Sequence, residues 1–241
     1  MCGPGAILIT GASSGLGAAL AETYAAPGRT LFLGGRDAAR LEAVARIATA
    51  KGAEVHTGII DVTDRTHMDN WIVSADRTAA LDLVIANAGI SAGTGDAGPE
   101  PAAQVRRVYA VNVDGVMNTV LPALALMQER RKGQIGIVSS MAGFRGFPGA
   151  PAYCGSKAAV KVFGEGLRPT AARDGIEVSV ICPGYIRSPM TAVNNFPMPF
   201  LMEADEAAEK IRRGLERNKA RIAFPWPIYA AVQLLQIIPP S

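Results

Sequence analysis

A tyrosine and a lysine four residues apart, Tyr153 and Lys157, have side chains that together could move a proton. On a helix, positions i and i+4 share a face, so the phenol and the ammonium can lie side by side. A free tyrosine titrates near ~10, and a nearby cation lowers that pKa toward the range of an efficient base. Ser140, thirteen residues upstream of Tyr153, could hold a substrate oxygen from a strand end. The three side chains could move a proton on and off an alcohol or a carbonyl if the chain also binds a hydride carrier.

A glycine-rich turn between the first expected strand and the first expected helix could bind that carrier. Its sequence, Thr10-Gly11-Ala12-Ser13-Ser14-Gly15-Leu16-Gly17, has the spacing Gly-x-x-x-Gly-x-Gly. Glycine permits a tight turn and a close approach of the backbone to a pyrophosphate, whose charge then faces a helix N-terminus. The turn predicts dinucleotide binding by Gly11, Ser13, Ser14, Gly15, Leu16 and Gly17.

The end of the second expected strand, Leu33-Gly34-Gly35-Arg36-Asp37, bears on which dinucleotide binds. An acidic residue here usually binds the ribose hydroxyls of NAD, whereas an arginine accommodates the 2′-phosphate of NADP. Gly35 leaves space and Arg36 supplies the cation, while Asp37 is the argument for NAD. We expect NADP, with NAD as the alternative.

Apolar strand-like runs alternate with amphipathic helical stretches along the chain. The alternation predicts an α/β fold, a Rossmann-like doubly wound parallel sheet of about seven strands with helices on both faces. The expected strands are 6–10, 30–34, 54–60, 81–86, 134–139, 177–181 and 220–223. The expected helices are 15–26, 37–51, 64–76, 101–131, 152–173 and 204–218. Residues 1–241 are expected to form a single dinucleotide-binding domain with a substrate loop at about 185–203 and an apolar tail at about 225–241.

The composition narrows the class of protein. With 241 residues, 49% of them hydrophobic, the chain can bury a large core, and its net charge of only +3 without a basic, aromatic-rich stripe argues against nucleic-acid binding. Three cysteines without paired spacing and two isolated histidines predict no disulfide framework and no metal site. The apolar run at 6–9 is too short for the core of a signal peptide, so we expect a cytoplasmic protein.

These motifs resemble those of the short-chain dehydrogenase/reductase family, in family order, as far as about residue 190. The matching residues are Thr10 to Gly17, Asp61-Val62, Asn87-Ala88-Gly89, Asn112, Ser140, Tyr153, Lys157 and Pro183-Gly184. The resemblance implies an NAD(P)-dependent oxidoreductase that transfers a hydride between the cofactor and a carbonyl or secondary alcohol. The alternative is a dinucleotide-binding regulator without catalysis, because a fold alone does not define an activity.

The resemblance also implies a role for each matching residue. The catalytic residues would be Asn112, which holds a water, Ser140, which binds the substrate oxygen, Tyr153, the acid or base, and Lys157, which binds the nicotinamide ribose. The remaining cofactor contacts would be Asp61, Val62, Asn87, Ala88, Gly89, Pro183, Gly184, Ile186 and Ser188, together with Tyr153 and Lys157. Two structural alternatives stay open: Asn112 could be a buried helix-capping amide, and Asp61 could only precede the next helix.

Apolar residues near these motifs suggest a largely nonpolar substrate. Met141, Phe147 and Tyr185, with Phe144, are expected to line its pocket, and the loop at 185–203 carries further aromatic and methionine side chains. The alternative is that these side chains only pack the loop onto the core.

The C-terminal run at 228–238 is apolar, is interrupted at helical spacing, and is too short to span a bilayer. It could pack on its own domain or on a partner subunit, contact substrate, or lie on a membrane surface as part of a peripheral reductase of lipid-like carbonyls. Burial between subunits of a homodimer or homotetramer is favoured. The sequence leaves open whether a longer tail has been truncated.

Pro169 lies inside the expected helix 152–173 and predicts a kink or an early helix end.

Overall fold

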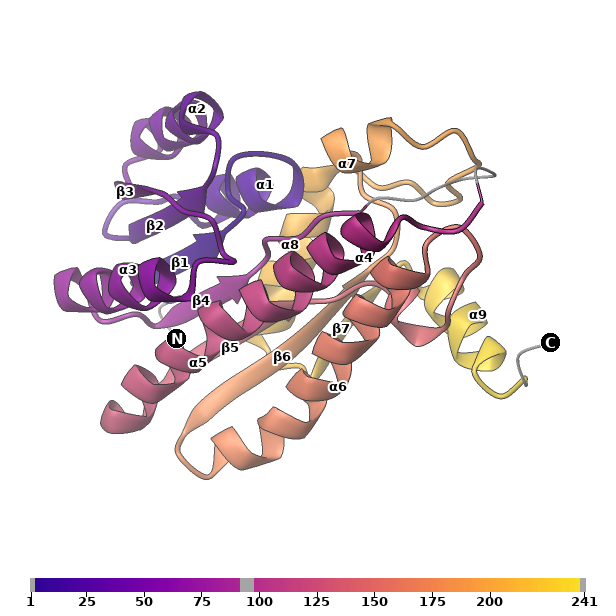
Figure 1. The fold of residues 1–241 in the computed structure, drawn as a ribbon. Helices are drawn as coiled ribbons and strands as arrows, with labels where there is room; N and C mark the ends of the chain where they lie inside the picture. Colours follow the sequence, from indigo (N-terminus) through magenta and orange to yellow (C-terminus); the bar gives the residue numbers. More distant parts are fainter. Residues whose placement is uncertain (1–2, 92–97, 239–241) are drawn as a thin grey trace.

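Seven strands form one sheet in the order β3-β2-β1-β4-β5-β6-β7 (Figure 1). The structure is a computed structural model that describes residues 3–91 and 98–238. All six strand pairings are parallel, which confirms the expected doubly wound sheet. The strands are β1 (Ala6–Thr10), β2 (Thr30–Gly35), β3 (Glu54–Ile59), β4 (Leu83–Ala86), β5 (Gly133–Val138), β6 (Ile176–Pro183) and β7 (Arg221–Phe224).

Helices cover both faces of this sheet (Figure 1). One buried cluster joins the sheet to α1, α2 and α8, and a second joins its other face to α3, α5 and α6. The helices are α1 (Gly15–Tyr24), α2 (Ala38–Ala50), α3 (Arg65–Thr78), α4 (Ala102–Tyr109), α5 (Gly115–Arg130), α6 (Pro151–Ala172), α7 (Pro189–Ala192), α8 (Ala204–Glu216) and α9 (Trp226–Leu235). The result is a three-layer arrangement with the core on both sides of the sheet.

The central strands are apolar along their whole length because both of their faces are covered. All five residues of β1 and all four of β4 are buried, as expected for a parallel sheet between two helical layers. The strand order reverses between β1 and β4: β2 and β3 lie on one side of β1, and the chain returns from β3 to place β4 on the other side. Such a topological switch point leaves a crevice at the carboxyl ends of the strands, where ligands of this fold class bind.

Aspartates begin two of the helices that flank this crevice. The side chain of Asp37 accepts a hydrogen bond from the backbone N–H of Arg40 at the start of α2, and Asp64 accepts one from His67 at the start of α3. A capping carboxylate satisfies a backbone donor that the helix itself leaves unpaired.

The expected helix 101–131 is one continuous helical segment with a π-helical turn, Ala110–Asp114, between α4 and α5. A π turn contains one extra residue and is frequent at functional sites. This segment is apolar and long enough to cross a membrane by length and composition alone. Its buried side chains, among them Val116, Val120 and Met127, pack instead within the core cluster that includes α3 and α6.

Helix α6 passes through Pro169 and ends at Ala172, so the early end predicted at the proline is wrong. The proline lacks the N–H that would bond the Glu165 carbonyl, yet the helix continues for three more residues. Beside it, the Arg168 guanidinium donates hydrogen bonds to the carbonyls of Val178 and Asn218, which tie this end of the helix to the sheet edge. Pro151 opens the helix at its first position, which a proline tolerates well.

The apolar tail folds back on its own chain as α9. Buried Val232 packs in a cluster with Met141, Phe144 and Cys182, and the side chain of Ile228 packs against it. Trp226 and Leu234 point outward instead and are 75% and 64% exposed. The tail thus contacts its own domain, whereas the sequence favoured burial between subunits.

Candidate active site

A cleft of about 1260 Å³ opens at the carboxyl ends of the strands, at the switch point between β1 and β4. It is lined by every site residue expected from the sequence except Asn112 and Phe144. These are Gly11, Ser13, Ser14, Gly15, Leu16, Gly17, Arg36, Asp61, Val62, Asn87, Ala88, Gly89, Ser140, Met141, Phe147, Tyr153, Lys157, Pro183, Gly184, Tyr185, Ile186 and Ser188. Residues scattered over most of the chain therefore meet in one cavity.

Ser140 and Tyr153 meet inside this cleft. Ser140 follows β5 and caps a short 3₁₀ helix, Met141–Phe144, by accepting a hydrogen bond of 3.1 Å from the N–H of Ala142. Burial raises the pKa of the Tyr153 phenol, and its hydrogen bond with the Ser140 side chain opposes that rise. The phenol therefore keeps its proton at neutral pH and can donate it to an oxygen held beside Ser140.

Lys157 lies one turn further along α6 and is 4% exposed. Its ammonium nitrogen donates a hydrogen bond of 3.0 Å to the carbonyl of Val138 and lies 5.9 Å from the centre of the Tyr153 ring. Burial lowers the pKa of Lys157 to about 8. The expected lowering of the tyrosine pKa by this cation is not found, because the ammonium bonds to Val138 and desolvation dominates at the phenol.

The neighbouring serine is used differently. The Ser139 hydroxyl donates a hydrogen bond of 2.7 Å to the backbone carbonyl of Lys157 inside the core. It ties β5 to α6, whereas the Ser140 side chain opposes the rise in the pKa of the Tyr153 phenol.

Asn112 lies in the π turn and is fully buried beside the cleft. Its side-chain oxygen accepts from the N–H of Ile90, and its side-chain nitrogen donates to the Ile90 carbonyl and to the Ser156 hydroxyl. A side chain built on Gly89 would come within 3.2 Å of the Lys157 nitrogen and 3.3 Å of the Asn112 oxygen. Asn112 thus holds Ile90, in the segment after β4, close to Lys157. Both polar atoms of its side chain are already used in the hydrogen bonds to Ile90 and Ser156.

The glycine turn is held rigidly against the end of β4. The Thr10 hydroxyl accepts from the backbone N–H groups of Asn87 and Ala88, and the Asn87 amide donates to the Thr10 carbonyl at 2.9 Å. Gly11 has φ +68°, and a Cβ there would lie 2.8 Å from the Ala88 Cα, so only glycine fits. The turn and Asn87-Ala88 form one rigid unit.

The N-terminus of α1 suits a phosphate. Ser14 precedes the helix in an extended conformation without a side-chain cap, and no acidic residue occupies the first turn. The first backbone N–H groups of the helix face the cleft without a local acceptor, which is the arrangement that binds a pyrophosphate. The residues at this end of the cleft fit a dinucleotide.

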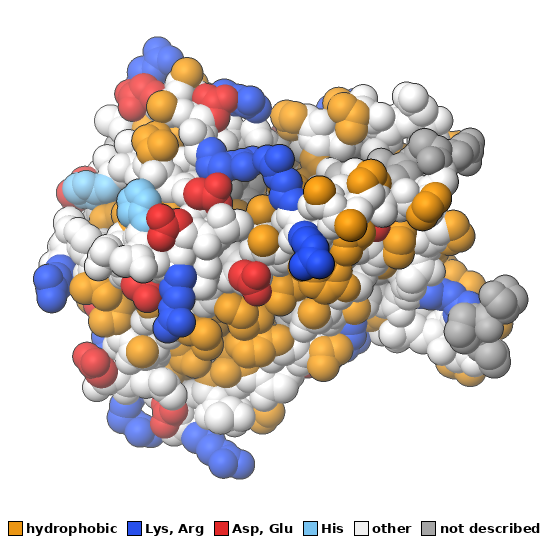
Figure 2. Space-filling model, in the orientation of Figure 1, with side chains coloured by type: hydrophobic (Ala, Val, Ile, Leu, Met, Phe, Trp, Pro, Cys, Tyr) orange, Lys and Arg blue, Asp and Glu red, His pale blue; other side chains and the backbone are white. Residues whose placement is uncertain are grey.

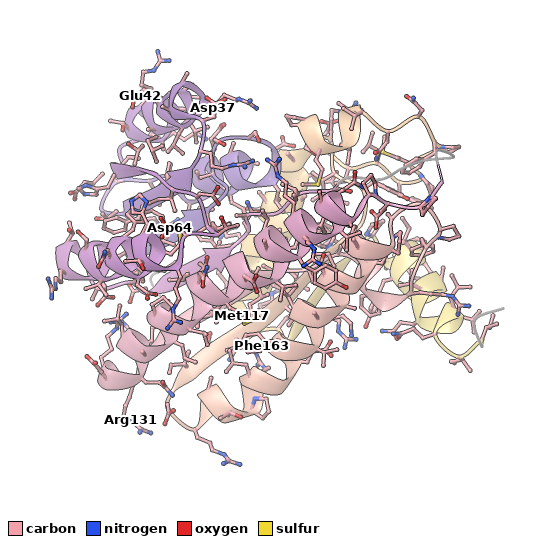
Figure 3. The ribbon with its side chains drawn as sticks, in the orientation of Figure 1. Asp37, Glu42, Asp64, Met117, Arg131 and Phe163 are labelled. Carbon is pink, nitrogen blue, oxygen red and sulfur yellow. The ribbon has the colours of Figure 1, made fainter. Side chains whose placement is uncertain are left out.

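The region after β2 separates the roles of Arg36 and Asp37. Asp37 is engaged with α2: it caps the helix and forms an ion pair of 2.6 Å with the Arg40 Nε, and these hydrogen bonds hold the pKa of its carboxyl below the ordinary range. Figure 3 shows Asp37 at the beginning of α2. Arg36 is exposed and, within the described ranges, belongs to no ion pair. Gly35 packs beside Ser13, with 3.2 Å between the position of a Cβ and the serine oxygen.

Asp61 and Val62 form the far wall of this region. Asp61 accepts hydrogen bonds from the backbone N–H and the hydroxyl of Thr63, and these hold its pKa below the ordinary range. It does not cap the next helix, because Asp64 does so. Asp61 precedes α3 without capping it, and its carboxylate lines the cleft, so its contact with the cofactor stays a prediction.

The opposite rim is formed by the segment after β6. The backbone N–H of Gly184 donates to the Phe224 carbonyl at 2.8 Å, and Ile186 forms an isolated β-bridge with Met202. The Ser188 side chain caps α7, and its Cβ lies 2.9 Å from the position of a Cβ on Gly15. This segment therefore begins directly above the glycine turn.

The substrate end of the cleft is largely apolar. Met141, Phe147 and Tyr185 line it as expected, and Phe196 joins them by packing edge-on to Tyr185 with 6.0 Å between ring centres. Phe144 was expected here but does not line the cleft. Its ring packs instead against Tyr229 and the side-chain cations of Lys161 and Arg221, and these contacts keep it out of the cleft.

Sequence reasoning missed further residues that line the cleft, among them Arg40, Cys154, Ile228 and Val232. Arg40 could have been found, because a basic residue three positions after a capping aspartate shares its helix face. Cys154 adjoins the expected tyrosine. The two α9 residues carry no local signal, since their place depends on how the tail folds back.

The fold and the cleft define a dinucleotide-binding α/β protein with a tyrosine, lysine and serine at the catalytic end. Comparison with known proteins gives the family. The family model for short chain dehydrogenase matches residues 5–197. An oxidoreductase of Myxococcus xanthus is 41% identical over 96% of this chain and 92% of its own length, and one of Mycobacterium tuberculosis is 34% identical over 97% and 94%. The chain belongs to the short-chain dehydrogenase family.

Solved structures agree with this assignment. A short-chain dehydrogenase from Sphingobium yanoikuyae in complex with NADPH superposes with a TM-score of 0.82 at 26% identity, covering 98% of this chain and 97% of that one. Levodione reductase superposes with a TM-score of 0.79 at 25% identity, covering 90% and 93%. The chain is therefore an oxidoreductase of a family that uses dinucleotides.

Proposed function

We propose that this protein uses NADP(H) to interconvert a carbonyl and a secondary alcohol in a largely nonpolar substrate. The observation that carries the proposal is that Ser140, Tyr153 and Lys157 line one cleft, with the Lys157 nitrogen 5.9 Å from the centre of the Tyr153 ring. A bound nicotinamide supplies or accepts the hydride, and the protein supplies orientation and the proton. A regulator without catalysis would have no use for this arrangement.

In the direction of reduction, each side chain has one task. The Ser140 hydroxyl holds the carbonyl oxygen, and the Tyr153 phenol donates its proton to that oxygen as the hydride arrives at carbon. The raised pKa of Tyr153 keeps it protonated for this step. Lys157 holds the nicotinamide ribose and, through it, the position of the phenol. A water replenishing the proton would bind the backbone of the π turn, because the Asn112 amide already bonds to Ile90 and Ser156.

The preference for NADP rests on Arg36. Its guanidinium lines the cleft without an ion-pair partner in the described ranges, Gly35 leaves room beside it, and Asp37 is occupied by α2 and Arg40. An arginine in this place can bind a 2′-phosphate.

Replacing Tyr153 by Phe tests the proposed function. The variant should bind NADPH with nearly unchanged affinity and lose turnover of ketones and aldehydes, because only the transferable proton is removed. NADPH binding followed by fluorescence and NADPH consumption against a panel of carbonyl compounds would show this. Turnover retained by Tyr153→Phe would rule out the assignment, and NADPH binding without turnover by the wild type would favour the regulator.

We also propose a homodimer or homotetramer formed through α5 and α6. Apolar side chains gather over this face in Figure 2. Leu121 and Val162 on it are large, apolar and exposed, and Figure 3 labels Met117 and Phe163 on the same two helices. Contiguous apolar surface of this kind marks interfaces.

A second candidate is a cytoplasmic enzyme that contacts a membrane and reduces lipid-like carbonyls. The exposed Trp226, Leu234 and Ile237 at the end of the chain favour it. Flotation with liposomes would separate the two: replacement of these three residues by Ser should abolish flotation if the membrane contact exists, and wild-type protein that stays unbound would exclude it.

A further inference from the structure

Helix α9 forms one wall of the cleft at its substrate end. Ile228 and Val232, four residues apart on one face of the helix, both line the cleft. A Cβ on Gly184, just beyond the end of β6, would lie 3.6 Å from the Ile228 Cδ1. Val232 is buried against the cluster that contains Met141, next to Ser140. The wall therefore stands beside the residue that holds the substrate oxygen.

The adjacent face of the same helix is polar, and its hydrogen bonds prevent the helix from rotating about its own axis. The Tyr229 hydroxyl accepts hydrogen bonds from the Arg221 guanidinium at 3.0 Å and from the Gln233 amide at 2.9 Å. Arg221 lies at the start of β7 and is fixed in turn by Glu165 of α6, with 3.1 Å between Nε and Oε1. Because Tyr229 follows Ile228 directly, this bond determines which way Ile228 faces.

Phe144 connects this brace to the catalytic segment. Its ring meets the Tyr229 ring edge-on at 5.7 Å between centres, and the Lys161 ammonium and the Arg221 guanidinium lie 4.9 and 5.4 Å from its centre. Phe144 ends the short helix that Ser140 begins, and Lys161 lies one turn after Lys157. One cluster therefore joins α9, the Ser140 segment and α6.

We propose that α9 selects substrates by the size of the apolar group on the substrate's carbonyl carbon. The Arg221–Tyr229 hydrogen bond sets this selection because it fixes the orientation of α9 about its own axis. Met141, Ile228 and Val232 offer this group only hydrocarbon and thioether surface, so the group that fits is an alkyl or aryl chain. The inference rests on the proposed function and names its substrate class: ketones, or the corresponding alcohols, whose larger substituent packs on α9.

Opposite changes at Ile228 test the wall. Ile228→Ala opens the pocket and Ile228→Phe fills it, while Leu234→Ala removes a similar side chain from the exposed face of the same helix. Methyl ketones from 2-butanone to 2-decanone are the substrates, and the readout is the ratio of kcat/KM for long chains to that for short chains. We expect a rise of about tenfold in Ile228→Ala and a comparable fall in Ile228→Phe. Leu234→Ala should match the wild type.

Tyr229→Phe tests the brace. It removes the oxygen that Arg221 and Gln233 bond while keeping the ring edge against Phe144. We expect KM for long-chain ketones to rise several-fold with kcat for short-chain ketones and the Kd for NADPH unchanged. A loss of thermal stability with the chain-length ratio unaltered would mean that Tyr229 only stabilises the fold, and would overturn its role in selection.

Unreactive primary alkyl amides of matching length separate this inference from the proposed function. Their binding is followed by the rise in Tm of each variant. If the wild type turns over no ketone but amide binding still changes with chain length in opposite senses in the two Ile228 variants, the proposed reaction fails and the wall stands. If ketones are reduced and the profiles of both Ile228 variants match that of Leu234→Ala, the wall is overturned. The same holds if neither turnover nor amide binding depends on chain length.

Discussion

The hydroxyl of Ser139 donates a hydrogen bond of 2.7 Å to the backbone carbonyl of Lys157, so the residue next to Ser140 fastens the catalytic helix to the sheet. Two adjacent serines thus face different surroundings. Ser139 is inside the core, and Ser140 meets the Tyr153 phenol in the cleft. Their alternation follows from strand geometry, in which successive side chains point to opposite sides.

Alanine at each serine should therefore have different effects. Ser140→Ala should lower kcat/KM about 100- to 1000-fold, the usual cost of losing a polar contact to the reacting oxygen, and should also cost about 1 kcal/mol of unfolding free energy because it removes the cap on the Ala142 N–H. Ser139→Ala should cost about 1 kcal/mol of unfolding free energy and leave most of the activity. Steady-state kinetics and urea unfolding of both variants would decide. A larger loss of activity in Ser139→Ala than in Ser140→Ala would reverse the assignment.

The buried ammonium of Lys157 should make the stability of the protein depend on pH. Its pKa is lowered from 10.5 to about 8, so between these values the unfolded chain binds more protons than the folded one. Unfolding free energy then rises with pH in this window, by at most about 1.4 kcal/mol per pH unit, whereas below pH 8 the cost of the buried charge is fully present. Lys157→Met should lack this rise.

Urea unfolding of the wild type and Lys157→Met at pH 7.0, 8.5 and 9.5 would measure the difference. Lys210→Met, on the exposed side of α8, serves as the control and should follow the wild type. Parallel curves for wild type and Lys157→Met would contradict the lowered pKa.

Arg36 should determine the choice of dinucleotide. Arg36→Ala should weaken NADPH binding about ten- to 100-fold, as expected for the loss of a charged hydrogen bond to a phosphate, and leave NADH binding nearly unchanged. Titration with both dinucleotides measures the ratio of Kd values, with Arg46→Ala on the exposed face of α2 as control. Tighter binding of NADH than NADPH by the wild type would overturn the preference.

The apolar face of α5 and α6 should govern assembly. Leu121→Glu with Val162→Glu places two charges on this face, and we expect the mass in solution to fall toward that of one chain because buried charges oppose association. Ile47→Glu, on exposed surface of α2, should leave the mass unchanged. Light scattering of the three proteins tests this, and a monomeric wild type would exclude the interface.

Most of the fold followed from local patterns in the sequence. The seven strands lie within a few residues of the expected ranges, because buried apolar runs bounded by glycine and polar residues report burial directly. The π turn around Asn112 left no such signal, since one extra residue in a long helix hardly changes its periodicity. Pro169 misled because the loss of the hydrogen bond to the Glu165 carbonyl did not end the helix, whose end is also tied to the sheet by Arg168.

The candidate site likewise contains residues that the sequence could place and residues that it could not. Motifs placed at strand ends, such as Gly11 and Asn87, could be assigned to the cleft because parallel strands bring their carboxyl ends together. Ile228 could not, because the bond between Tyr229 and Arg221 that orients α9 forms only in the folded protein. Phe144 was misplaced for a related reason: its partners come from α6, β7 and α9.

The π turn at Ala110–Asp114 has a consequence for the long helical segment that contains it. Its buried residues are Val108, Val111, Asn112, Gly115, Val116, Thr119, Val120, Ala123 and Met127. Within this stripe the steps from Val108 to Asn112, Val116 and Val120 are each four residues, wider than the ~3.6 of an α-helix. The inserted residue thus corrects the drift of the buried stripe, so that α4 and α5 present one face to the protein over their combined length. A deletion of one residue in this turn would rotate α4 about 100° against α5. The turn that places Asn112 beside Lys157 therefore also keeps the buried faces of α4 and α5 aligned.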